Sequence, residues 1–213
     1  LLKMAAEHGL EKIYIHAFMD GRDTPPTSGL DYISQLQREL VRIGTGRLAT
    51  ISGRFYAMDR DQRWERILVA WQAIVDGHGI LGRDPVQAVK DAYKRGETDE
   101  FVKPVCIHSA ASAAGSIVQD GDGIIFFNFR ADRARQILGA GGARHDAERH
   151  LGAGSDLGER LDGQRGLAPA VDTDQADALP LAAERGAVRR WWAAMLERRG
   201  APGDEDRAVH LLY

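Results

Sequence analysis

Residues 12–23 read Lys12-Ile13-Tyr14-Ile15-His16-Ala17-Phe18-Met19-Asp20-Gly21-Arg22-Asp23. As far as Phe18 the run is rich in β-branched and aromatic side chains, which favour strands. The turn dipeptide Asp20-Gly21 then ends it. This stretch therefore predicts a buried strand whose end carries a polar, arginine-containing loop.

Helical and strand-like patterns alternate along the chain after this strand. Leu30, Ile33, Leu36, Leu40 and Ile43 follow a helical spacing, and the next residue, Gly44, is a typical C-terminal stop. Further strands are expected at 48–52, 104–107 and 123–128, and further helices at 64–75, at 84–95 and from about residue 132. The alternation predicts a layered α/β/α domain.

Composition excludes several classes of function. The 213 residues carry a formal net charge of −3, which argues against a nucleic-acid partner or a membrane surface held by bulk charge. No apolar run reaches the roughly 18 residues of a membrane span. Cys106 is the single cysteine, so the chain has no internal disulfide, and a reducing cytoplasm is the expected location.

The composition changes near residue 139. Residues 1–138 contain all the isoleucine, phenylalanine and lysine of the chain, whereas residues 139–213 are rich in alanine, glycine and arginine. We therefore expect one domain over 1–138, and over 139–213 a poorly patterned, partly helical tail without a strand. The tail is expected to be of low order or to result from a shifted reading frame. Because the chain begins with Leu1 and not with Met, we also expect the domain to lack an upstream segment.

Arginines follow three of the predicted strands. Since ligands of layered α/β folds bind beyond the carboxyl ends of strands, these loops are the expected site. The guanidinium fork suits bidentate binding of phosphate or carboxylate, so a small polyanion is the predicted ligand. Alternatively, each arginine pairs with a nearby aspartate in an exposed salt bridge worth about 0–1 kcal/mol. The candidate residues are Arg22, Arg54, Arg60, Arg130 and Arg133.

Other candidate sites have less support. His16 lies in the middle of an apolar strand, as a packed core histidine would, and Cys106 has the surroundings of a small core residue. No GxxxxGK[ST] loop is present, which argues against a P-loop nucleotide site. RNA binding through the arginine loops is disfavoured by the neutral charge balance and by the lack of a recognised RNA-binding motif.

Four motifs make the sequence similar to a known family, the cofactor-independent phosphoglycerate mutases. They occur in the family's order and cover roughly residues 1–138, which correspond to the family's substrate-binding domain. No match is found for residues 139–213. The motifs are His16-Ala17-Phe18-Met19-Asp20-Gly21-Arg22-Asp23-Thr24-Pro25-Pro26, Ser52-Gly53-Arg54-Phe55-Tyr56-Ala57-Met58-Asp59-Arg60-Asp61, Thr98-Asp99-Glu100-Phe101-Val102-Lys103-Pro104 and Phe126-Phe127-Asn128-Phe129-Arg130-Ala131-Asp132-Arg133-Ala134-Arg135.

The resemblance implies an isomerase of glycolysis and gluconeogenesis that interconverts 3-phosphoglycerate and 2-phosphoglycerate through a phosphoserine. It implies that Arg22, Arg54, Arg60, Arg130 and Arg133 hold the substrate, and that Asp23 contacts it and is a candidate general acid or base. The phosphoserine and two metal ions, usually Mn²⁺, belong to the family's phosphatase-like domain, for which this chain has no counterpart. The chain alone is therefore expected to be inactive; the alternative is a stand-alone binding module for a phosphorylated metabolite.

Overall fold

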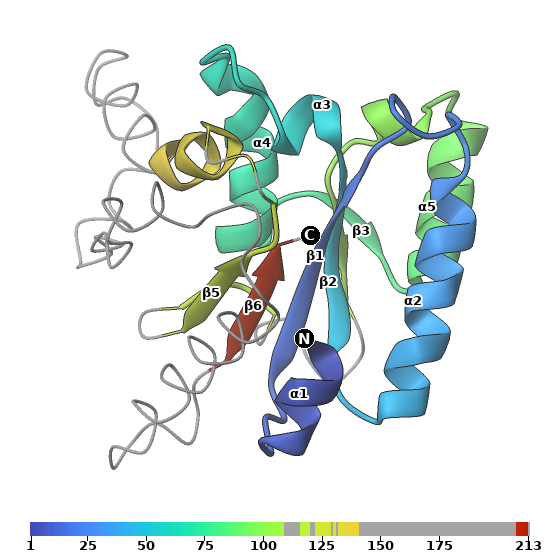
Figure 1. Ribbon diagram of the computed structural model, residues 1–213. Coiled ribbons are helices and arrows are strands. Elements are labelled where there is room, and N and C mark those ends of the chain that lie inside the picture. The colour runs from blue at the N-terminus through green and yellow to red at the C-terminus, as the bar shows by residue number, and fades with distance from the viewer. Residues whose placement is uncertain (109–115, 120–121, 129, 131, 141–207, 213) are drawn as a thin grey trace.

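The computed structural model describes residues 1–108, 116–119, 122–128, 130, 132–140 and 208–212. Within these residues, one mixed sheet of six strands has the order β3-β4-β2-β1-β6-β5 and carries helices on both faces (Figure 1). The predicted α/β/α layering is confirmed. The elements are α1 (Leu2–Glu7), β1 (Ile13–Met19), α2 (Gly29–Ile43), β2 (Arg47–Gly53), α3 (Arg54–Ala57), α4 (Trp64–Val75), β3 (Ile80–Gly82), α5 (Pro85–Lys94), the 3-10 turn η1 (Asp99–Phe101), β4 (Val105–Ile107), β5 (Gly123–Phe126), β6 (Val209–Leu212) and a helix over 132–140.

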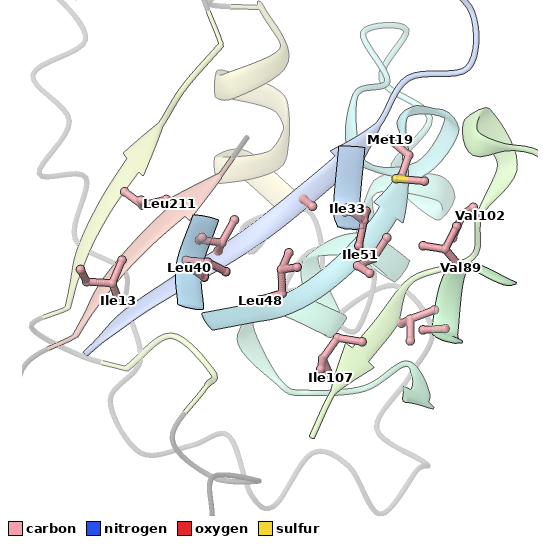
Figure 2. Packing of buried hydrophobic residues seen from close by; sticks show 14 of the residues in the cluster. Ile13, Met19, Ile33, Leu40, Leu48, Ile51, Val89, Val102, Ile107 and Leu211 are labelled. Carbon is pink, nitrogen blue, oxygen red and sulfur yellow. The ribbon is translucent and has the colours of Figure 1, made fainter. Parts of the chain in front are cut away.

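The first face of the sheet packs against α1, α2 and α5. Every second residue of β1, from Ile13 to Met19, points to this side, where it meets Ile33 and Leu40 of α2 and Val89 of α5 (Figure 2). These side chains are almost fully buried, so each isoleucine or leucine stabilises the fold by about 1.5–3 kcal/mol. The helical spacing of α2 thus has a packing cause, and the helix ends where predicted, with Gly44 at a φ of 82°.

The second face packs against α4 and the helix over 132–140. Its core joins Ile67 and Ile74 of α4 to Ile137 and to Leu212 of β6. Phe18 and Phe126 add a tilted ring pair between β1 and β5, with centroids 5.9 Å apart. The helix that carries Arg133 is thereby fixed to the sheet through Ile137.

The last described residues of the chain form an interior strand. β6 pairs in parallel with β1 on one side and with β5 on the other, and its four residues are buried. The prediction that the tail contains no strand is therefore wrong for 209–212. A four-residue run that is buried on both faces shows no alternation by which it could have been recognised. Residues 141–207 and 213 lie outside the described residues, so the predictions of low order or a shifted frame stay predictions there.

The opposite edge of the sheet differs from a purely parallel arrangement. β4 runs antiparallel to β2, and the short β3, which the sequence analysis did not predict, pairs with β4 in parallel at the edge. Within the described ranges, no helix has the length and apolar character needed to cross a membrane.

Candidate anion-binding site

The predicted site loops meet at one edge of the sheet. β1, β2, β5 and β6 all run parallel, so their carboxyl ends lie along the same edge (Figure 1). Met19 at the end of β1 stands beside Gly53 at the end of β2. The residues that follow, Asp20 and Arg54, are therefore neighbours although 34 positions separate them in sequence.

Arg54 joins the first two loops. Its Nη1 donates to Asp20 Oδ1 and, at 2.8 Å, to Asp23 Oδ2. Burial acts to lower the pKa of the largely buried guanidinium, but the two carboxylates outweigh it and raise that pKa. Nε and Nη2 form no hydrogen bond within the described residues. One side of the guanidinium fork therefore organises the loops, while the other remains available to a ligand.

Asp23 is exposed on the loop after β1. Its backbone N–H donates to Asp20 Oδ2 at 3.2 Å, which folds the loop back on itself. The hydrogen bond from Arg54 is the main cause that lowers the pKa of Asp23, and Arg22 and Arg133 act in the same direction. Asp23 is therefore ionised at neutral pH, and its carboxylate accepts the hydrogen bond from Arg54.

Arg133 lies in the first turn of the helix over 132–140 and is buried. Its Nε has no hydrogen-bond partner in the described part of the chain. Burial lowers the pKa of this guanidinium, and the positive charges of Arg54, Arg130 and Arg60 lower it further. A buried cation among other cations is unfavourable unless an anion compensates it, so these arginines define an electropositive site.

Arg22, Arg60 and Arg130 are exposed around this centre. Within the described residues none of them, nor Arg133, forms an ion pair with an acidic side chain. Among the described residues, Arg54 is thus the one candidate arginine that pairs with aspartates, and both of them lie in the loop after β1. The structure brings the five predicted arginines to one edge of the sheet, and their role in binding a substrate stays a prediction.

The η1 turn, which the sequence analysis did not count as part of the site, separates and supports the two loops. Val102 O accepts a hydrogen bond from Gly53 N at 2.7 Å. A Cβ atom on Gly21 would lie 2.6 Å from Glu100 N, and one on Gly53 would lie 2.3 Å from Glu100 O. Both loops thus approach the Glu100 backbone more closely than any side chain allows.

Asp99 anchors η1 from inside the fold. One carboxylate oxygen accepts from Gly29 N at 2.7 Å, at the start of α2, and the other accepts from the Tyr93 hydroxyl. Burial is the main cause that raises the pKa of Asp99, and burial followed by the hydrogen bond to Asp99 raises that of Tyr93. Asp99 therefore ties η1 to the start of α2 and to α5.

Asp59 anchors the loop that carries Arg60. Its Oδ2 accepts from the backbone N–H groups of Asp61 and Arg63, both at 3.0 Å, and from Gln136 Nε2 at 2.7 Å. Gln136 lies on the same helix as Arg133, so one buried carboxylate connects two of the arginine-bearing segments.

Replacing Asp59 with alanine is expected to lower the free energy of unfolding by about 2–4 kcal/mol. Hydrogen bonds to a charged acceptor contribute about 1.5–3 kcal/mol each, and the Gln136 amide would be left buried without its partner. Chemical denaturation measures the change. Asp61→Ala is the control because that side chain is exposed, and it should stay within about 0.5 kcal/mol of the parent chain. Equal losses in both variants would contradict the anchoring role.

Metal binding has no evident place among the described residues. No group of three or more His, Cys, Asp or Glu side chains there could hold a metal ion. Asp20 and Asp23 each accept a hydrogen bond from Arg54, so a guanidinium cation already neutralises these two carboxylates. The described residues therefore do not fit a two-metal centre.

Together, the fold and the site define an α/β domain that presents a cluster of arginines at the carboxyl ends of parallel strands. The chain belongs to the family of BPG-independent phosphoglycerate mutases: residues 1–153 match the family model of the N-terminus of these enzymes. The resemblance carried by the sequence motifs is thereby confirmed.

Individual relatives agree with this assignment. The chain is 50% identical over 140 residues to a 2,3-bisphosphoglycerate-independent phosphoglycerate mutase of Myxococcus xanthus, an alignment that covers 66% of this chain and 27% of the relative. It is 53% identical over 137 residues to the enzyme of the same name from Syntrophotalea carbinolica, covering 64% and 26% of the two chains. The chain thus spans about a quarter of the length of these relatives.

The fold also resembles a solved structure, a Leishmania mexicana phosphoglycerate mutase crystallised at low cobalt concentration. The TM-score is 0.60 and the identity 24%, over 65% of this chain and 27% of the other. At this identity the comparison supports the arrangement of sheet and helices only.

Proposed function

We propose that this chain is the substrate-binding part of a phosphoglycerate mutase and that its arginine cluster holds 2- or 3-phosphoglycerate. The substrate carries a phosphate and a carboxylate, and each is a bidentate acceptor for guanidinium groups. Arg22, Arg54, Arg60, Arg130 and Arg133 would share these contacts. Membership of the family and the convergence of the five arginines at one edge support the proposal.

The observation that carries the proposal is the state of Arg133. It is buried, its Nε is unpaired within the described residues, and other guanidinium groups lower its pKa. A structural arginine would have its donors satisfied by carbonyl or carboxylate oxygens. A multiply charged anion would satisfy the Nε and would also relieve the repulsion among the arginines.

Asp23 is the proposed acid or base for the substrate hydroxyl. As Arg54 keeps its carboxylate ionised, Asp23 would first accept the hydroxyl proton and would return it in the reverse direction. This transfer of the proton in both directions requires Asp23 to stay within reach of both Arg54 and the substrate. Its exposed position on the loop after β1 is consistent with that requirement.

The remaining chemistry is assigned to a part of the enzyme outside this chain. We propose that a phosphatase-like domain supplies the phosphoserine and two metal ions, Mn²⁺ by resemblance, and that the complete enzyme works in glycolysis and gluconeogenesis in the cytoplasm. This chain would then bind and orient substrate without turning it over. A stand-alone module for a phosphorylated metabolite would show the same binding but would need no such partner domain.

We expect the purified chain to bind 3-phosphoglycerate with a dissociation constant in the millimolar range or weaker. Four or five charge-assisted hydrogen bonds of about 1.5–3 kcal/mol each must offset an association cost of about 4–15 kcal/mol. A titration followed by NMR would show shifts at the arginine side chains and at the loop after β1. Glycerate and inorganic phosphate, which each retain part of the substrate's charge, serve as controls and should bind more weakly. Micromolar affinity, or mutase turnover by the chain with Mn²⁺, would contradict the half-site proposal.

A further inference from the structure

A chain of buried hydrogen bonds crosses the middle of the sheet, away from the arginines. Thr50 Oγ1 lies 2.9 Å from His16 Nδ1, His16 Nε2 lies 2.9 Å from His210 Nδ1, and His210 Nε2 lies 3.0 Å from Asp122 Oδ2. Both histidines are fully buried. The four side chains come from β2, β1, β6 and the residue that precedes β5, so the chain ties together four consecutive strands.

This row of hydrogen bonds exists because the pairing of β1 and β2 shifts by one residue. Ile15 pairs with Leu48, whereas His16 pairs with Thr50, so Ala49 is skipped. Side chains alternate along a strand, and without the shift Thr50 would point to the same face as Leu48. The irregularity turns Thr50 to the face that carries His16 and His210, and the register then continues unchanged to Met19 and Gly53.

The carboxylate at one end determines the direction of its own hydrogen bond with His210. Asp122 also accepts hydrogen bonds from the backbone N–H groups of Ala208 and Gln119, at 2.8 and 2.9 Å. Burial acts to raise the pKa of Asp122, but these bonds and the one from His210 outweigh it and lower that pKa. Asp122 is therefore ionised and accepts, so His210 Nε2 must carry a proton.

The remaining protons are placed here for a His210 that carries a proton on Nε2 alone. A neutral His210 then has an accepting Nδ1, so His16 Nε2 must donate to it, and the accepting His16 Nδ1 requires a proton from the Thr50 hydroxyl. When His210 carries only the Nε2 proton, this assignment satisfies each buried nitrogen of the two rings. Burial, and to a lesser extent His210, lowers the pKa of His16 well below its usual range, in agreement with a neutral ring.

We propose that Thr50, His16, His210 and Asp122 form a one-directional hydrogen-bond chain that fixes the register of β2, β1 and β6, and so acts as a set of positioning residues for the strand ends that carry Asp20 and Arg54. The role in positioning Asp20 and Arg54 rests on the proposed function, whereas the direction of the hydrogen bonds and the register of the strands do not. Asp20 and Arg54 meet only because Met19 stands beside Gly53, and that alignment lies downstream of the shift at His16.

An added proton on His210 would reverse the direction of the hydrogen bonds from His210 to Thr50. A proton on His210 Nδ1 would turn that atom into a donor facing the donor on His16, so His16 would have to change its tautomer and the Thr50 hydroxyl would have to rotate. Besides Asp122 and His16, the groups around His210 are the Tyr14 ring, stacked at 5.1 Å, and Arg47, 5.5 Å above that ring. Because the pKa of His16 is lowered in the folded state, the unfolded chain takes up the proton first. The contribution of neutral His16 to the free energy of unfolding is therefore fully present above the pKa of an unfolded histidine, and it decreases as the pH drops below that value.

The direction can be read from the side-chain nitrogens of the histidines. In ¹⁵N-labelled chain at neutral pH, we expect His16 and His210 both to be neutral with the proton on Nε2. A proton on Nδ1 of His16 would overturn the proposal, and so would a doubly protonated His16 at neutral pH. The measurement needs no ligand, so failure to bind phosphoglycerate would refute the proposed function and leave this result unaffected.

Variants of β2 test the positioning role. Thr50→Val keeps the shape of the side chain but removes the hydroxyl, and we expect it to shift the His16 nitrogens and the Arg54 Nε signal and to lower the melting temperature by about 4 °C or more. Thr50→Ser should restore all three. Ser52→Ala is the matched control, because it removes a buried hydroxyl of the same strand that has no hydrogen-bond partner in the described part of the chain. An unchanged Arg54 signal in Thr50→Val, or an equal change in Ser52→Ala, would contradict the role. If Thr50→Val does not fold, the tautomers of the parent chain still decide the direction.

Discussion

Gly53→Ala is expected to destabilise the chain by about 1–3 kcal/mol or more and to separate the loops that follow β1 and β2. The added methyl group would stand 2.3 Å from Glu100 O and 2.7 Å from Asp99 O. Both are backbone atoms of η1, which is itself held by the Asp99 carboxylate, so the clash cannot be relieved by rotation of a side chain. Overpacking of this kind usually costs about 1–3 kcal/mol, and more where the surroundings are rigid.

Thermal unfolding followed by circular dichroism measures the effect, and the loss of the Gly53 N to Val102 O hydrogen bond should appear as faster amide exchange at Gly53. Gly139→Ala is the matched control. Among the described residues, an added Cβ there meets only the edge of Trp64, at 4.0 Å, and alanine favours the helix over 132–140 by up to about 1 kcal/mol. A Gly53→Ala chain as stable as the parent would show that η1 moves freely and does not set the spacing of the loops.

The importance of Gly53 illustrates what the sequence could not predict. The strand over 48–52 and its end at Gly53 were visible from β-branched residues and a glycine stop. The partner that makes the glycine necessary, the Glu100 backbone, lies far along the chain, and no local pattern indicates such an approach. Prediction therefore located the end of β2 correctly but missed the physical reason for the residue there.

Buried acidic residues were missed for a similar reason. In sequence, Asp59 and Asp99 resemble the solvated aspartates of any loop. They are buried because distant donors, the Gln136 amide for Asp59 and the Gly29 backbone N–H for Asp99, complete their hydrogen bonds. The arginines were easier to predict, since parallel strands bring their carboxyl ends to one edge whatever the details of packing.

For His16, the sequence predicted the burial of the side chain but not its hydrogen-bond partner. Its position in an apolar strand predicted a packed histidine, and the ring is indeed fully buried. Its main partner, His210, lies in the segment from which no strand was expected, because Val209–Leu212 is too short to show a pattern. The long separation between β5 and β6 in sequence conceals that they are neighbours in the sheet.

Arg54→Ala is expected to raise the pKa of Asp23 toward its usual range and to weaken phosphoglycerate binding by about tenfold or more. The hydrogen bond from Arg54 is the largest cause of the lowered pKa, and no other described side chain donates to that carboxylate. A lowered pKa in the folded state stabilises the fold at neutral pH, and this contribution disappears as the pH falls through that pKa. The variant should therefore lose part of the acid dependence of unfolding as well as affinity.

Carboxyl ¹³C signals recorded against pH give the pKa of Asp23 directly, and the titration with 3-phosphoglycerate gives the affinity. One charge-assisted hydrogen bond contributes about 1.5–3 kcal/mol, which corresponds to a factor of ten or more in the dissociation constant. Arg42→Ala serves as the control, since Arg42 forms an exposed ion pair with Glu39 in the last turn of α2 and neither quantity should change.

Arg54→Lys separates the effect of charge from that of side-chain geometry. A lysine keeps the positive charge near Asp20 and Asp23 but cannot present a second pair of donors to an anion. It should thus retain most of the lowered pKa while losing affinity, and a lysine variant that binds as tightly as the parent would show that Arg54 acts through its charge alone.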